Sequence, residues 1–144
     1  MAKLLDFKLS GAGAMQDILQ SLTFAPNKSV LTKILLKNGK PIAEDAASRV
    51  RHRSGALARN ARVGTQLSPR QAAMHKKLGP GVEVFIGFGP IPYAHMQEFG
   101  TIHHAAHPAL RPAWEHGKGM MWSGIKRDLW RHLYNMAKRR STND

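Results

Sequence analysis

The sequence has no cysteine, few acidic residues and no long apolar run. Without cysteine the 144-residue chain can form no disulfide bond, no thiolate zinc site and no cysteine nucleophile, which fits assembly in a reducing cytoplasm. No window approaches the roughly 18 uninterrupted apolar residues of a membrane-spanning helix. The start, MAKLLDFKLSG, is broken by Asp6 and Lys8 and lacks a small-residue cleavage site. We therefore expect neither a membrane-spanning segment nor a signal peptide.

The shortage of acidic residues makes the chain strongly basic. Its 22 Lys and Arg residues against 9 Asp and Glu give a formal net charge of +13. Such a charge favours association with a polyanion such as nucleic acid, and equally with the acidic surface of another protein. The length favours one domain spanning residues 1–144.

The usual catalytic motifs are missing. There is no Gly-x-Ser-x-Gly elbow and no Gly-rich loop that ends in Gly-Lys-Ser or Gly-Lys-Thr. His103, His104 and His107 follow the spacing i, i+1, i+4, but Pro108 opposes a helix through them, and Glu98 is one of only two acids that flank the cluster. We expect no catalytic residue, no cofactor and no metal site, with a His-metal nuclease as the less favoured alternative.

Two helical segments are predicted in the first half of the chain. Apolar residues at helical spacing over residues 15–22 predict a short helix before Pro26, and a longer stripe follows over residues 28–51. Within that stripe, Gly39 and Pro41 are unfavourable in a helix interior. A kinked helix, or two helices that meet there, is expected. The stripe comprises Val30, Leu31, Ile34, Leu35, Ile42, Ala46 and Val50.

The pattern then changes to the period of two that is typical of strands. Residues 61–67 and 82–88 alternate apolar and other side chains, which predicts two strands that pair antiparallel. The segment between them, residues 68–81, is predicted to protrude as a helix of its own. Ser68 and Gln71 would form its capping box, Pro69 its first residue, and Gly79 its end.

A basic amphipathic helix is predicted over residues 119–140, followed by a frayed tail at residues 141–144. The whole reads as an α+β protein, with a small antiparallel sheet packed against a long kinked helix and this C-terminal helix. Its apolar stripe is expected to comprise Trp122, Ile125, Leu129, Leu133 and Met136.

Three segments, in order along the chain, resemble a known family. RSGALARN resembles a Thr-Gly-x-Leu-Arg segment, PYAHMQEFGT a Tyr-Ala-x-x-x-Glu-Phe-Gly-Thr segment, and HPALRPAWE a Pro-x-Leu-Arg-Pro-Ala segment of the gp-ten-like neck and tail-completion proteins of long-tailed bacteriophages. The likeness spans about residues 28–138, and the middle segment is the most specific. The sequence departs from the family pattern at Ser54, at Ala58 and in the His-rich loop at 102–107.

The resemblance implies a virion structural protein, not an enzyme. Such a protein is assembled in the host cytoplasm and lies in the neck, as a homo-oligomeric, sixfold-compatible ring between the head-closure (connector) protein and the tail terminator or tail tube. Double-stranded DNA would pass through the lumen, bound weakly and without sequence preference. A basic DNA- or RNA-binding protein is the alternative.

The resemblance also gives the segment 93–115 a role as a structural joint. Tyr93–Phe99 would form one or two helical turns, with Tyr93 and Phe99 facing inward and Glu98 accepting hydrogen bonds from the next loop or pairing with an arginine. Gly100 would supply a turn that needs positive φ. The structural and interface residues expected from the resemblance are Ser54, Gly55, Leu57, Tyr93, Ala94, Glu98, Phe99, Gly100, Thr101, Pro108, Leu110, Arg111, Pro112, Ala113, Arg127 and Arg131.

The basic residues would then divide between two tasks. DNA must slide during ejection, and each neutralised phosphate strengthens the hold on it. Most of the cations are therefore expected to contact acidic surfaces of neighbouring ring proteins, and a minority to line the lumen. The residues concerned are Arg49, Arg51, Arg53, Arg59, Lys126, Arg127, Arg131, Lys138, Arg139 and Arg140.

Overall fold

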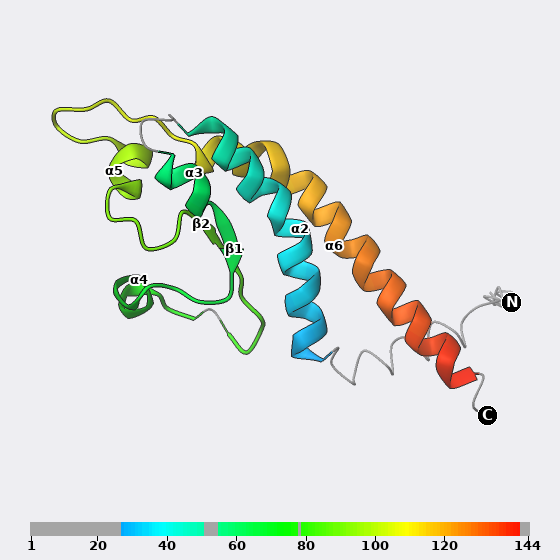
Figure 1. Ribbon diagram of the computed structural model, residues 1–144. Coiled ribbons are helices and arrows are strands. Elements are labelled where there is room, and N and C mark those ends of the chain that lie inside the picture. The colour runs from blue at the N-terminus through cyan, green and yellow to red at the C-terminus, as the bar shows by residue number, and fades with distance from the viewer. Residues whose placement is uncertain (1–26, 51–54, 78, 142–144) are drawn as a thin grey trace, which may run out of the picture.

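The computed structural model describes residues 27–50, 55–77 and 79–141. Two long helices lie together along part of their length, and a small sheet and the short helix before it pack on the first of them (Figure 1). Two further short helices lie on the same side. This confirms the α+β class, while the helix predicted before Pro26 lies outside the described residues. The elements in chain order are α2 (Lys28–Arg49), α3 (Ala56–Asn60), β1 (Arg62–Gly64), α4 (Pro69–Met74), β2 (Phe85–Gly87), α5 (Ala94–Phe99) and α6 (Leu110–Ser141).

Helix α2 continues through the residues that were expected to interrupt it. Pro41 lies inside the helix on its exposed side, so the alternative of two helices is wrong, although the axis changes direction part-way along in Figure 1. The glycine at position 39 inside the helix has a packing reason. A Cβ atom there would lie 3.2 Å from Val63 and 3.4 Å from Ile86, so glycine allows the sheet to approach the helix.

Helix α6 joins the predicted terminal helix to the turns around Pro112 in a single 32-residue rod. At a rise of about 1.5 Å per residue it is about 48 Å long. Small residues bring it close to α2. A Cβ on Gly117 would lie 2.7 Å from Ile42, and one on Gly124 would lie 2.0 Å from Asn38, so both positions exclude a side chain.

The buried face of α6 differs from the predicted stripe at one position. Leu133 is buried and its neighbours Ile125, Leu129 and Met136 are half-buried, as expected. Trp122, however, is 61% exposed, because the side facing α2 winds through Gly117 and Gly124 instead.

The two strands pair antiparallel, as predicted, with Val63 opposite Ile86. They are shorter than the period-two pattern predicts, with three residues each. The ladder includes Gly64 and Gly87, which add no side chain to its packing. The sheet is therefore a short platform on α2.

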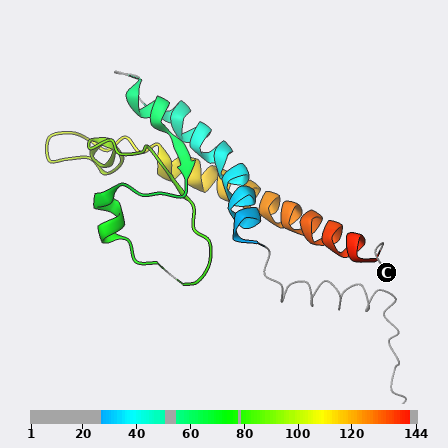
Figure 2. The ribbon, with the colours of Figure 1, turned by 60° about the horizontal axis from the view of Figure 1, so that its bottom comes forward.

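The insertion between the strands carries α4, whose capping box at Ser68 and Gln71 forms as predicted. Helix α4 ends at Met74, five residues before Gly79, which was expected to stop it. None of its residues is buried, and both views show α4 and its loops standing clear of the helix pair (Figures 1 and 2).

The main apolar cluster lies where α2, α3, β2 and the first turns of α6 meet. It joins segments that are distant in the sequence, and it fixes the region around the start of α6. Its buried members are Ile42, Ala46, Val50, Leu57, Phe88, Ala109 and Ala113.

Candidate interface site

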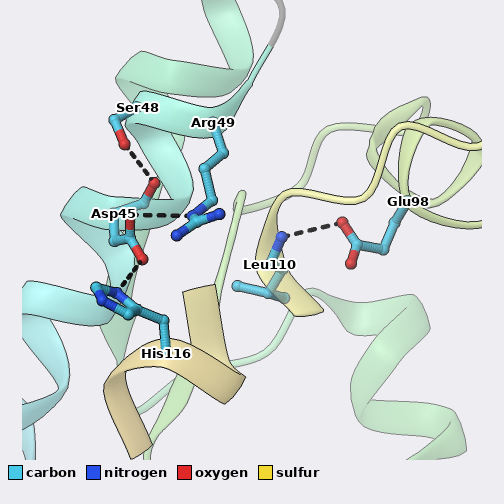
Figure 3. A network of polar contacts seen from close by, with 6 residues as sticks. All are labelled: Asp45, Ser48, Arg49, Glu98, Leu110 and His116. Atoms are coloured by element: carbon cyan, nitrogen blue, oxygen red, sulfur yellow. Dashed lines mark hydrogen bonds and ion pairs between the residues drawn. The ribbon is translucent and has the colours of Figure 1, made fainter. Parts of the chain in front are cut away.

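The start of α6 is capped by a carboxylate from another helix. Glu98, near the end of α5, accepts hydrogen bonds from the backbone N–H groups of Ala109 (2.9 Å), Leu110 (3.1 Å) and Arg111 (2.8 Å). Figure 3 shows the carboxylate directed at the Leu110 nitrogen. Of the two roles predicted for Glu98, this geometry selects acceptance of loop N–H groups.

Together these bonds satisfy the first donors of the helix. The next residue, Pro112, has no N–H, and the Ala113 N–H reaches the Ala109 carbonyl at 3.2 Å. A helix leaves its first N–H groups without an intrahelical partner, and here each has an acceptor or is absent. The negative charge also lies at the positive end of the helix dipole, which is the favourable arrangement. Glu98 therefore sets where α6 begins.

Gly100 directs the chain from α5 towards that helix start. Its φ of 76° and ψ of 177° lie in a region that is essentially restricted to glycine. A Cβ there would meet the backbone nitrogen of Ala106 at 2.8 Å and the carbonyl oxygen of His104 at 3.0 Å. The expectation of a turn that needs positive φ is confirmed.

The histidine loop beyond Gly100 is held by backbone bonds. The Thr101 hydroxyl accepts from the N–H groups of His103 (3.3 Å) and His104 (3.1 Å), and the His107 N–H donates to the Gln97 carbonyl (2.8 Å). All three imidazoles are exposed. Among the described residues, no group of three or more His, Asp and Glu is placed to hold a metal ion.

The three segments that resemble the phage family meet around this cap. Leu57 of the first segment is buried in the same cluster as Ala109 and Ala113 of the third, and Ala94 of the second packs against it. Gly55, with φ of 69°, starts α3. Ser54, which was also expected here, lies outside the described residues.

Two aromatic residues of the middle segment point the other way from the prediction. Tyr93 is 43% exposed and Phe99 is 69% exposed, so the expectation that both face inward is wrong. Helix α5 has no buried residue; Ala94 packs against the apolar cluster, and Glu98 bonds to the start of α6. The Arg111 guanidinium lies over the Phe99 ring, 5.1 Å from its centre. The segment therefore presents apolar surface outward.

Polar contacts also join α2 to α6. Asp45 accepts from Arg49 Nε at 3.0 Å and lies 3.2 Å from His116 Nδ1, as Figure 3 shows. These two hydrogen bonds, that of Arg49 first, hold the pKa of Asp45 below its ordinary value. Arg49 is thus paired within its own chain.

A second polar contact was not foreseen from the sequence. Asp128, the buried acid of α6, accepts from Lys37 Nζ at 2.9 Å and from Asn38 Nδ2 at 3.1 Å. These bonds, Lys37 first, lower the pKa of Asp128. The signal available in the sequence was the pair Gly117 and Gly124, seven residues apart on one helix side, which marks a close helix contact.

The remaining predicted cations lie at the surface. Those described with their side chains are all exposed, whereas Arg51 and Arg53 lie outside the described residues. Arg140 lies within α6, and its side chain is not described. The exposed members are Arg59, Lys126, Arg127, Arg131, Lys138 and Arg139.

An open apolar groove of about 1260 Å³ lies beside the cap. It is bounded by α4, by β2 and the chain after it, by α5 and by the first half of α6. Phe85, Ile91, Phe99, Leu110 and Trp114 are among its apolar lining, and Glu98 lies on its wall. An exposed apolar surface of this kind suits the docking of another protein segment.

Comparisons of the chain with protein-family models, with curated proteins and with solved structures find no match. In the part of the chain that the structure describes, no helix is long and apolar enough to cross a membrane.

Proposed function

We propose that the protein is a structural component of the neck of a long-tailed bacteriophage, where its copies form a ring around the DNA channel. The observation that carries the proposal is the meeting of the three family-like segments around the Glu98 cap, through Leu57, Ala94 and Ala113. Leu57 of the first segment meets Ala94 and Ala113 of the later two at one joint, and that joint is made of caps and small apolar contacts. A joint of this kind supports a structural role in an assembly.

The exposed side of the joint supplies the contacts that a ring requires. Phe99, Tyr93 and the apolar groove lie on the same part of the molecule. Monomeric proteins rarely expose large contiguous apolar patches, and such patches often mark protein–protein contacts. The ring would lie between the head-closure protein and the tail terminator or tail tube, and DNA would pass through its lumen.

The oligomeric state of the purified protein tests the ring. We expect closed oligomers by native mass spectrometry and sedimentation, and we expect their loss in a Tyr93→Ser/Phe99→Ser variant. Met120→Ser is the matched control, because Met120 is 78% exposed on α6 and does not line the groove. Circular dichroism checks that each variant stays folded. A wild-type protein that remains monomeric at every concentration would contradict the ring.

The alternative, a nucleic-acid-binding protein, draws support from the cations on α6, including Lys126, Arg127 and Arg131. The neck proposal expects weak duplex binding that shows no sequence preference and disappears at physiological salt, since DNA must slide. The logarithm of the binding constant falls with that of salt by about 0.9 per phosphate contact, so a titration counts the contacts. Tight binding to one duplex sequence at physiological salt would favour the alternative.

A further inference from the structure

The C-terminal half of α6 exposes a row of aromatic residues. Trp122, Trp130 and Tyr134 are 61%, 58% and 57% exposed, and Lys126 lies between the first two, 5.8 Å from the Trp122 ring centre. Successive residues are four apart, so all lie along one side of the helix over about 18 Å. We call Trp122, Lys126, Trp130 and Tyr134 the aromatic-basic stripe.

The stripe takes no part in the packing of α6 on α2. Helix α6 meets α2 through Gly117, Gly124 and Asp128, and none of the four stripe residues is buried. Single exposed aromatics are common, but here three follow one another along one helix, with Lys126 between the first two. Trp, Tyr and Arg are also the residues that contribute most often to binding energy at protein interfaces. The stripe has the composition of a docking surface.

Charge selects the kind of partner. Arg127 and Arg131 flank the stripe and are exposed, while the only acid between residues 118 and 139 is Asp128. That carboxylate is buried and is already bonded to Lys37 and Asn38, and Arg127 Nε lies 3.9 Å from it. Every exposed charge on this half-helix is therefore positive. If this side of one copy met the same side of a second copy, like charges would face one another, which is unfavourable.

We propose that the aromatic-basic stripe docks on an acidic, apolar-lined helical surface of another protein. Such a surface pairs carboxylates with Lys126, Arg127 and Arg131 and covers the rings of Trp122, Trp130 and Tyr134. The phosphates of duplex DNA would pair with the cations, but the DNA would leave much of the surface of the tryptophan rings in water. Single-stranded nucleic acid stacks on aromatic rings within grooves that follow its backbone, whereas none of the stripe residues lines the apolar groove beside the cap or the smaller hollow beside Thr32 and His75.

The inference rests on the proposed function in one respect: the partner is taken to be the protein that lies next to the ring in the neck. The stripe would contact that neighbour, while the joint around Glu98 and Phe99 would contact copies of the same chain. The two contacts use separate surfaces, so each can be removed alone.

The test measures binding of the full chain to a labelled amphipathic peptide helix that has leucines on one side flanked by glutamates. We expect saturable binding that is accompanied by a blue shift of tryptophan emission. The Trp130→Ala/Tyr134→Ala and Lys126→Glu/Arg131→Glu variants should each bind at least about tenfold more weakly, the loss expected for central interface residues. The four side chains replaced in these variants are all exposed, so the variants should fold, and melting curves verify this.

Matched controls separate the stripe from general charge. Lys76→Glu/Lys77→Glu makes the same change in net charge on the exposed insertion and should alter peptide affinity by no more than about twofold. An equal loss in this control, or unchanged affinity in the stripe variants, would overturn the proposal. So would tighter binding of labelled oligothymidine or duplex DNA than of the acidic peptide.

Oligomeric state, measured on the same samples, distinguishes the two proposals. Rings that persist in the stripe variants while peptide binding is lost would support a stripe that faces a different protein. Stripe-dependent peptide binding by a wild type that never forms oligomers would support the docking surface and contradict the ring.

Discussion

Removal of the Glu98 carboxylate tests the joint most directly, because one side chain serves three backbone donors. In Glu98→Ala the N–H groups of Ala109, Leu110 and Arg111 lose their acceptor. Water can replace part of that bonding at the partly exposed helix start, so the loss is smaller than that of three buried bonds. Loss of a cap typically costs about 0.5–2 kcal/mol, and loss of a charge at the helix dipole about 0.3–1 kcal/mol. We expect the free energy of unfolding to fall by about 2 kcal/mol in total.

Glu98→Gln provides a graded variant, because its carbonyl oxygen can still accept one bond but carries no charge. It should lose about 1 kcal/mol, roughly the share of the dipole and one cap bond. Glu44→Ala on the exposed side of α2 is the matched control and should stay within about 0.5 kcal/mol of the wild type.

The assays are urea unfolding, followed by circular dichroism, and hydrogen exchange of individual amides. Exchange should accelerate at residues 109–111 in both Glu98 variants and remain unchanged at the centre of α6. If those amides exchange at the wild-type rate in Glu98→Ala, or if its stability equals that of the Glu44 control, Glu98 does not hold the start of α6.

Two further predictions concern Gly100 and Asp128. Gly100→Val should lower the free energy of unfolding by about 3 kcal/mol and the melting temperature by about 10 °C, through its positive φ and the backbone atoms that its Cβ meets. Gly119→Ala, where a Cβ meets nothing within 4 Å in the middle of α6, should instead be neutral or gain up to about 1 kcal/mol; equal losses at both glycines would refute the turn. Because the folded-state pKa of Asp128 is lowered, its contribution to stability is present above its ordinary value of 3.8 and is lost as the pH falls through the folded value. Asp128→Asn should therefore flatten this part of the acid-unfolding curve, and a variant with the wild-type slope would show that the carboxylate has no such role.

The sequence was sufficient to predict features that depend on interactions between residues close together in the chain. The Ser68 and Gln71 capping box lies within four residues and forms as expected. The alternation of residues 61–67 and 82–88 predicted two strands that pair antiparallel, and the structure adds the register of Val63 opposite Ile86. The positive φ of Gly100 was expected from the family-like segment. The role of Glu98 as an acceptor for the next loop was expected from the family-like segment, and the structure identifies the donors.

Long-range packing decided the points on which the sequence misled. Gly39 and Pro41 suggest an interruption when they are read as helix breakers, but α2 continues because Gly39 admits the sheet and Pro41 faces solvent. Trp122 was expected in the core because its spacing matched an ideal helix. The side facing α2 is chosen by close contact at Gly124, and that leaves the indole outside.

The sequence by itself determined the α+β class, the order of the main helices and strands and the capping box of α4, since propensity, periodicity and capping act over a few residues. Only the tertiary structure decided which of their sides meet, because contacts such as Asp128 with Lys37 join residues far apart along the chain. The same holds for the outward side of Phe99 and for the aromatic-basic stripe. A side chain is exposed only because the packing of every other element leaves it uncovered, and no local pattern contains that information.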